Sequence, residues 1–178
     1  NSAGVSTSAG SDTIVLAKDC IGGAACTWGD YGTGFSDATS ISTNPIFIAS
    51  SPSGNAIATW TQGTNVWAVL YVNGAWDTAN KTDLNTDGGT PYLNTAYNLR
   101  AAINDSGKAV VIWFENTQQS LQAKIYNGSS WSSTEKDISA SAYGTSITRS
   151  NPRVGIDNNG RIMAMWLQTD GSENSVFY

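Results

Sequence analysis

The chain contains no histidine, so acid–base chemistry near neutral pH would have to use carboxylates, tyrosines or lysines. Glu115 is the one acid at the end of a strand-like segment where two similar segments carry Gln62 and Gln168. A glycosidase usually needs two carboxylates at a defined separation, and the sequence pairs no second acid with Glu115. The pattern favours a tolerated Gln-to-Glu exchange in a solvated loop, and it leaves Glu115 as a candidate ligand-binding residue.

A second acidic segment, DLNTDGG, alternates oxygen-bearing side chains and ends in a turn glycine. Asp83, Asn85 and Asp87 match the first half of a calcium-binding loop. Its twelfth position is Asn94 rather than the bidentate glutamate, and no apolar helices flank it. The segment is therefore either a weak calcium site or a polar connecting loop, and calcium is the only cofactor that the sequence suggests.

Aromatic residues that do not recur along the chain are the other candidates for ligand binding. Trp67 does not recur in the other copies of the repeat, so no packing role common to the copies requires a tryptophan there. It could therefore stack on a sugar or on a partner side chain. Four more candidates lie in long polar loops: Tyr92, Tyr97, Tyr143 and Arg149. Tyrosine with Asn, Ser and Arg is typical of adaptable recognition surfaces, and also of ordinary loops.

The two cysteines, Cys20 and Cys26, flank the flexible segment IGGAA, which would let them meet. A disulfide is the preferred prediction, because the composition is otherwise that of an exported protein, and two free thiols are the alternative. A metal site is not expected here, since two cysteines without any histidine cannot complete a tetrahedral shell.

The charge pattern argues against nucleic acid as a partner. The net charge is −5, and the nine Lys and Arg residues are not clustered, so no basic footprint exists for a phosphate backbone. No apolar run reaches the roughly 18 residues that would cross a bilayer, so membrane insertion is not expected. A carbohydrate or a protein surface remains the expected partner.

The composition also suggests a location. Few charges, 18 Gly and seven Trp are typical of sheet-rich secreted proteins, which predicts an extracellular or cell-surface protein, with the periplasm as the alternative. Residues 1–11 are small and polar and predict a disordered N-terminal tail. Such a tail could be what remains after removal of a signal segment, or an arbitrary boundary.

An internal repeat organises the rest of the chain. Three segments align, beginning at Asn44, Asn98 and Asn151, and their turn glycines and tryptophans recur at intervals of 53 residues: Gly54, Gly107, Gly160, Trp60, Trp113 and Trp166. Each segment reads as two apolar strands joined by a short turn, which predicts a β-hairpin of strands a and b. The first copy carries one extra residue, which the alignment places in its turn. Recurrence at the end of strand b favours core packing for these tryptophans.

Two further strands follow in each copy. Strand c is expected at 66–72, 121–126 and 175–178, and an Asn-Gly turn then leads to a recurring tryptophan and a weaker strand d. The N-terminal region fits the same template if 12–42 supplies strands c and d only. The expected organisation is thus c and d at 12–42, whole units at 44–86 and 98–140, and strands a, b and c at 151–178.

Such repeats resemble the β-propeller blades of bacterial exported proteins, in which Asn-Pro, a turn Gly, a strand-b Trp-x-Gln and a later Gly and Trp recur. The resemblance covers residues 12–178, and the second copy departs from it at Leu99 and Glu115. It implies an all-β fold of four-stranded antiparallel blades. About three blades are too few for a closed ring, so the propeller would be partial, or completed by further repeats, by other copies of the chain, or by an unusually small ring.

Three functions remain open. The favoured one is a non-catalytic exported module that binds a glycan or a protein through the variable b–c and d–a loops, which share one end of a propeller. The second is a structural or assembly element of a larger propeller or an oligomeric ring. The third is a fragment of a sialidase-like or glycosidase-like enzyme, for which the sequence offers only Glu115 and scattered arginines.

Overall fold

The computed structural model of the chain describes residues 20–21, 27–28, 35, 46–91, 98–116, 119–139, 149–169 and 174–178. These residues form antiparallel β-sheets, together with one 3-10 turn, η2 (Thr78–Asn80). The expectation of an all-β fold is confirmed. Within the described part of the chain, no helix has the length and apolar character to cross a membrane.

The strands form one small hairpin and three larger sheets. The hairpin pairs β1 (Cys20–Ile21) with β2 (Thr27–Trp28). Sheet 1 contains β3 (Ile46–Ser50), β4 (Ala56–Gln62), β5 (Asn65–Val72), β6 (Ala75–Trp76) and β7 (Thr82–Asp83). Sheet 2 contains β8 (Leu99–Ile103), β9 (Ala109–Glu115), β10 (Ser120–Tyr126) and β11 (Lys136–Asp137). Sheet 3 contains β12 (Arg149–Ile156), β13 (Ile162–Thr169) and β14 (Asn174–Phe177).

The hairpin turn that opens each sheet has the same geometry in all three copies. The turn glycine has a positive φ, which only glycine adopts without strain, of 89° at Gly54, 74° at Gly107 and 85° at Gly160. Each glycine N–H donates to the carbonyl three residues earlier, in Ser51, Asn104 and Asp157. These turns have equal lengths, so the extra residue of the first copy does not lie in its turn, and that placement was wrong.

The fourth strand position is broken into two short pieces. In sheet 1 both β6 and β7 pair with β5, and η2 separates them. In sheet 2 a single bridge joins Tyr126 to Trp131, and β11 then pairs with β10. The aromatic pairs that begin this segment are alike, with ring centroids 5.2 Å apart for Tyr71 and Trp76 and 5.4 Å apart for Tyr126 and Trp131. The recurring tryptophan of the c–d turn therefore packs on the tyrosine of strand c.

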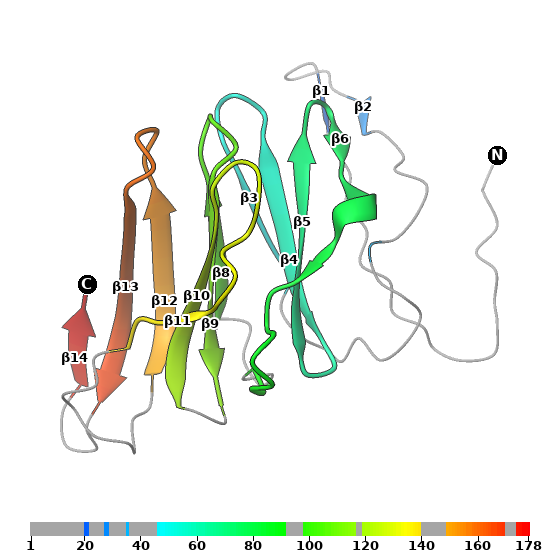
Figure 1. The fold of residues 1–178 in the computed structure, drawn as a ribbon. Helices are drawn as coiled ribbons and strands as arrows, with labels where there is room; N and C mark the ends of the chain where they lie inside the picture. Colours follow the sequence, from blue (N-terminus) through cyan, green and yellow to red (C-terminus); the bar gives the residue numbers. More distant parts are fainter. Residues whose placement is uncertain are drawn as a thin grey trace.

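The three larger sheets stand next to one another in chain order (Figure 1). Sheets 1 and 2 enclose one apolar core, which includes Ile57, Leu70, Leu84, Leu99, Val111 and Trp113. Sheets 2 and 3 enclose another, which includes Val110, Ile112, Ala123, Val154, Ile162 and Ala164. Because successive side chains of β9 alternate between these two cores, every residue of that strand is buried. This face-to-face packing makes β9 the central strand of the described molecule.

The strand-b tryptophans are core residues, as their spacing predicted. Trp60, Trp113 and Trp166 are 0%, 1% and 7% exposed. Trp60 lies on the face of sheet 1 that points away from sheet 2, where it stacks on Phe35 with ring centroids 5.9 Å apart. Removing such aromatic area from water is a main source of stability in a sheet stack.

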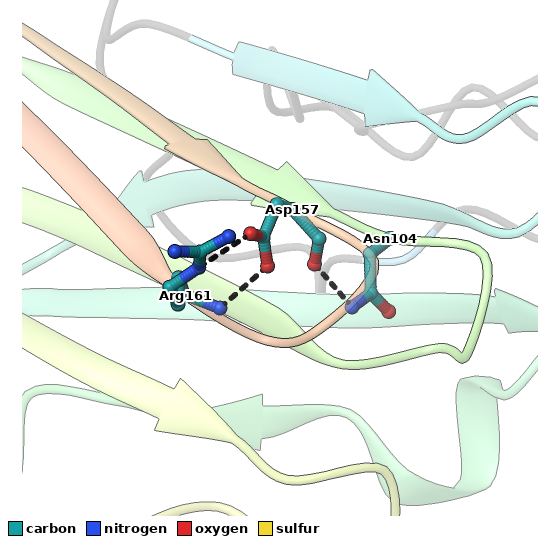
Figure 2. A network of polar contacts seen from close by, with 3 residues as sticks. All are labelled: Asn104, Asp157 and Arg161. Atoms are coloured by element: carbon teal, nitrogen blue, oxygen red, sulfur yellow. Dashed lines mark hydrogen bonds and ion pairs between the residues drawn. The ribbon is translucent and has the colours of Figure 1, made fainter.

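Polar side chains in the turns join neighbouring sheets at one end of the stack. Asn104 of sheet 2 donates through Nδ2 to the carbonyl oxygen of Asp157 in sheet 3, at 2.9 Å (Figure 2). Asp157 in turn accepts hydrogen bonds from the backbone N–H and the Nε of Arg161. Asp105 accepts from the Ser53 N–H of sheet 1 and from Asn158 Nδ2 of sheet 3. Asp105 and Asp157 therefore hold adjacent sheets together as well as stabilising their turns.

The described sheets are open, and no ring closes among them. The expected tail at 1–11 and most of the expected 12–42 strands lie outside the described residues. Cys20 begins β1 and pairs with Trp28 of β2. Cys26 lies outside the described residues, so the disulfide stays a prediction.

Candidate functional site

Glu115 occupies a position that is structural in every repeat. The Nε1–H of Trp113 donates to Glu115 Oε2 at 3.3 Å, and the other two copies repeat this bond with glutamine. The distance is 3.5 Å from Trp60 to Gln62 and 3.1 Å from Trp166 to Gln168. Glu115 is 0% exposed, so the expected solvated loop was wrong at this position. Its side chain is instead buried at the end of β9.

Two other carboxylates converge on Glu115. Asp87 follows β7, and Glu135 precedes β11, so the three acids come from two sheets. One carboxylate oxygen from each residue lies within 4.8 Å of the other two. We refer to Asp87, Glu115 and Glu135 as the acidic trio. Glu115 is buried, Glu135 is half-buried and Asp87 is exposed, so the trio opens toward solvent on one side.

The local environment favours the protonated form of Glu115. Burial, together with a smaller effect of the nearby charges of Asp87 and Glu135, raises the pKa of its carboxyl group to about 7. The hydrogen bond from Trp113 acts in the opposite direction. The Oε1 atom of Glu115 is buried and accepts no hydrogen bond, which leaves part of a charged group without compensation.

The trio is held by the connection between β7 and β8. Asn85 donates through Nδ2 to the carbonyl oxygens of Thr64 and Gly89, both at 2.8 Å, which folds this connection against the β4–β5 turn. Glu135 Oε1 accepts the backbone N–H groups of Thr86 and Asp87. The connection therefore bridges sheets 1 and 2 at the end opposite the hairpin turns, where the b–c and d–a loops were expected to meet.

The backbone of Gly89 lies directly against the trio. A Cβ at this position would collide with the carboxyl group of Glu115. The Gly89 N–H donates to Asp87 Oδ1 at 3.0 Å. A residue without a side chain is thus needed for the loop to lie on the buried carboxylate.

Lys124 supplies a positive charge next to the trio. It lies in β10 and is 4% exposed, yet its Nζ donates to two uncharged oxygens. These are the carbonyl oxygen of Leu84, at 3.2 Å, and Oγ1 of Thr86, at 3.1 Å. Because Thr86 also donates to Glu135, the ammonium group lies one hydrogen-bonded residue away from the acids.

The residues of the expected calcium loop are divided by the structure. Asp83 accepts hydrogen bonds from Asn65 Nδ2 and from the Asn85 N–H, and burial raises the pKa of its carboxyl group. Asn85 uses its amide to fix the loop backbone. Asp87 is the only one of the three that belongs to the acidic trio.

Trp67 lies on the outer face of sheet 1, away from the trio. It is half-buried against the aromatic cluster around Trp60, and the Nζ of Lys81 lies 4.7 Å from its ring centroid. The contact is a cation–π interaction, which leaves less of the indole available to a ligand. Tyr92, Tyr97 and Tyr143 lie outside the described residues. Arg149 begins β12, paired with Gln168, and its side chain is likewise outside the description.

Polar grooves lie at the hairpin-turn end of the stack. One has a volume of about 530 Å³ and lies between sheets 1 and 2, lined by Ser53, Asn55, Asn73, Asp105 and Tyr126 among others. A neighbouring groove of about 270 Å³ includes Asp77, Asn80, Tyr126 and Trp131. Sequence reasoning did not find these grooves, because they arise from the packing of two separate sheets.

Sequence reasoning also missed Glu135, Lys124 and Gly89. Glu135 and Lys124 stand in the weak fourth strand and in strand c, where a charged residue is ordinarily solvated. In SLQAKIY, Lys124 shares one face of the strand with Ser120 and Gln122, and this polar alternation predicts a solvated lysine. No signal in a single sequence places Glu135 near Glu115.

The fold and the site define an all-β protein built from repeated antiparallel sheets that pack face to face. Comparison of the chain with protein-family models, with curated proteins and with solved structures finds no match. Any functional conclusion must therefore come from the residues themselves.

Proposed function

We propose that the chain is a non-catalytic binding module of an exported protein, built from β-propeller-type repeats. It recognises a glycan or a protein segment through the loops that follow strands b and d. The supporting observation is that residues 84–91, the described part of the β7–β8 connection, are held against sheets 1 and 2 by hydrogen bonds of Asn85 and Glu135. A loop that is ordered before binding loses less conformational entropy when it captures a ligand.

Burial of Glu115 supports a binding role over an enzymatic one. A glycosidase acid or nucleophile must touch its substrate, and the Glu115 side chain is fully buried. Asp105 and Asp157 are engaged by turn N–H groups, which lowers the pKa of both carboxyl groups. Those acids serve the scaffold.

Glycan and peptide arrays test the proposal. We expect binding by the chain that is lost in a variant combining Tyr92→Ala, Tyr97→Ala and Tyr143→Ala. A matched variant at the opposite end, Asn55→Ala in the 530 Å³ groove, should bind as the parent does. Loss of binding in Asn55→Ala alone would move the site to the groove, and turnover of a chromogenic glycoside would contradict the non-catalytic proposal.

A second candidate function, assembly with another sheet of the same repeat, is favoured by the outer face of sheet 3. Met163, Met165 and Val176 are 68%, 50% and 57% exposed. Met163 and Met165 stand 53 residues after Val110 and Ile112, which are buried between sheets 2 and 3. Strand pairing places Val176 at the position of the buried Leu121. The exposed residues therefore hold the positions that bury against the next sheet elsewhere in the stack.

The face of sheet 1 that points away from sheet 2 could pack against the outer face of sheet 3 of another copy. Ile46 and Ile48 are each 55% exposed there, and register places them at the positions that Leu99 and Ala101 occupy in sheet 2. A head-to-tail contact between two copies would repeat the packing of sheet 1 on sheet 2. Heterologous contacts of this kind make rings when the rotation closes.

Sedimentation equilibrium tests this second candidate. We expect concentration-dependent association that is abolished by the pair Met163→Glu and Met165→Lys, and retained by Ser132→Glu on the exposed c–d turn. A parent chain that stays monomeric at all concentrations would rule out association through this face.

A further inference from the structure

The acidic trio has the dimensions of a divalent cation site. One oxygen from each of Asp87, Glu115 and Glu135 lies within 4.8 Å of the other two. Calcium binds oxygens at about 2.3–2.6 Å, so two oxygens on opposite sides of the ion stand about 5 Å apart. The three carboxylates could therefore contact one ion without rearrangement of the sheets.

The Oε1 atom of Glu115 points to a ligand independently of the number of acids nearby. Glu115 is fully buried and lies on the inner side of the trio, and this oxygen has no hydrogen-bond partner. Buried carboxylate oxygens are normally compensated by a donor or a cation. Glu115 Oε1 is thus a buried carboxylate oxygen that no hydrogen-bond donor in the described part of the chain compensates.

The repeat shows that the charge at this position is not required by the fold. Gln62 and Gln168 accept the same indole hydrogen bond as Glu115 does, and both are neutral. Only the copy with Asp87 and Glu135 beside it carries a carboxylate here. The negative charge therefore belongs to the site rather than to the scaffold.

The chemistry of the donor set favours a divalent ion. All three groups are carboxylates, and the neighbouring Lys124 ammonium donates its hydrogen bonds to neutral oxygens of Leu84 and Thr86. Hard oxygen ligands from loops and a strand end suit calcium, which tolerates irregular geometry better than magnesium does.

We propose that Asp87, Glu115 and Glu135 bind a calcium ion that fastens the β7–β8 connection of sheet 1 to the ends of β9 and β11 in sheet 2. The ion would order the loop end of the stack whatever ligand the loops recognise. Asp87 belongs both to this site and to the calcium loop expected from sequence. The other two ligands are Glu115 and Glu135 of sheet 2, in place of Asp83 and Asn85.

Calorimetric titration of the EDTA-treated chain with calcium chloride tests the proposal. We expect one site per chain, a rise in the melting temperature, and a change in tryptophan emission because Trp113 is bonded to Glu115. Glu115→Gln should fold, since glutamine serves the other copies, and should weaken calcium binding at least tenfold. Asp77→Asn, at a half-buried acid beside η2 and outside the trio, should bind calcium as the parent does.

The outcomes are distinct. Absence of both heat and a melting shift at millimolar calcium would overturn the proposal, as would unchanged affinity in Glu115→Gln. Magnesium chloride giving the same shift as calcium would overturn the assignment to calcium. If Glu115→Gln does not fold, Asp87→Asn at the exposed rim replaces it and carries the same expectation.

Discussion

At the scale of single residues, Glu115 combines two roles that conflict. As an acceptor for the Trp113 indole it does what Gln62 and Gln168 do in the other copies. As a buried carboxylate it also carries a charge that its surroundings do not fully compensate. The site therefore costs stability whenever that charge forms without a partner cation.

This conflict predicts a pH dependence in the absence of divalent ions. The pKa of Glu115 is raised from 4.5 to about 7, so the folded chain binds the proton more tightly than the unfolded chain. The free energy of unfolding should consequently fall as the pH rises from about 4.5 to 7, by about 3 kcal/mol in total. Glu115→Gln should remove this fall, so the variant gains stability at pH 8 and not at pH 4.

Urea unfolding in EDTA at the two pH values measures the effect. Asp77→Asn serves as the control, since it removes an acid outside the trio and leaves the trio intact. A Glu115→Gln variant with the same stability difference from the parent at pH 4 and pH 8 would show that the carboxyl group does not titrate as described.

The residue scale also marks a limit of prediction from sequence. The repeat singled out Glu115 because it departs from glutamine, and it correctly assigned Trp60, Trp113 and Trp166 to the core. It could not reveal burial of Glu115, because the b–c segment reads as polar. Burial results from the β7–β8 connection, a segment whose path one sequence does not specify.

At the scale of elements, the hairpin turns do more than reverse the chain. Asn104 Oδ1 accepts the N–H groups of Ser106 and Lys108 within its own turn, and its Nδ2 reaches the Asp157 carbonyl of the next sheet. The turn glycines were predictable from sequence. The bonds between turns were not, because they require the sheets to be stacked first.

Asn104→Ala tests the contribution of these bonds. Loss of three hydrogen bonds at a residue that is 3% exposed should lower the free energy of unfolding by about 2 kcal/mol. Asn127 is a matched control, since its Oδ1 accepts Ser129 and Ser130 N–H groups within an exposed turn. Asn127→Ala should cost less than about 1 kcal/mol. Equal costs in chemical denaturation would show that the bond between sheets contributes nothing.

Gly89 offers a second test at this scale. Gly89→Ala places a methyl group against the Glu115 carboxyl, and overpacking of this kind costs about 1–3 kcal/mol. Gly155→Ala is the matched control, because a Cβ at Gly155 in β12 meets no atom within 4 Å. Thermal unfolding should separate the two variants. If Gly89→Ala is as stable as Gly155→Ala, the loop does not lie on the carboxylate.

At the scale of the whole molecule, the period of 53 residues predicted the three sheets, but it did not predict that their fourth strands are split into short pieces. The strands expected at 66–72 and 121–126 are present as β5 and β10, and the third copy ends with β14. The fourth strand is split because polar residues such as those of η2 interrupt its pairing with strand c. A sequence pattern also leaves open how many sheets stack, since each sheet contacts only its neighbours.

Stacking makes the sheets unequal in protection. Sheet 2 is covered by sheets 1 and 3, whereas the outer face of sheet 3 exposes Met163 and Met165. Amides of a strand with both faces and both edges covered open only through large unfolding events. β9, between β8 and β10, meets these conditions at every residue.

Residue-resolved hydrogen exchange tests the central claim that the chain is a stack of sheets repeating every 53 residues. We predict protection maxima at 56–62, 109–115 and 162–169, which are the middle strands of the three sheets, with the greatest protection in β9. The hairpin turns and the split fourth strands should exchange much faster. Protection maxima that do not follow this spacing, or a β9 no better protected than the turns, would contradict the account.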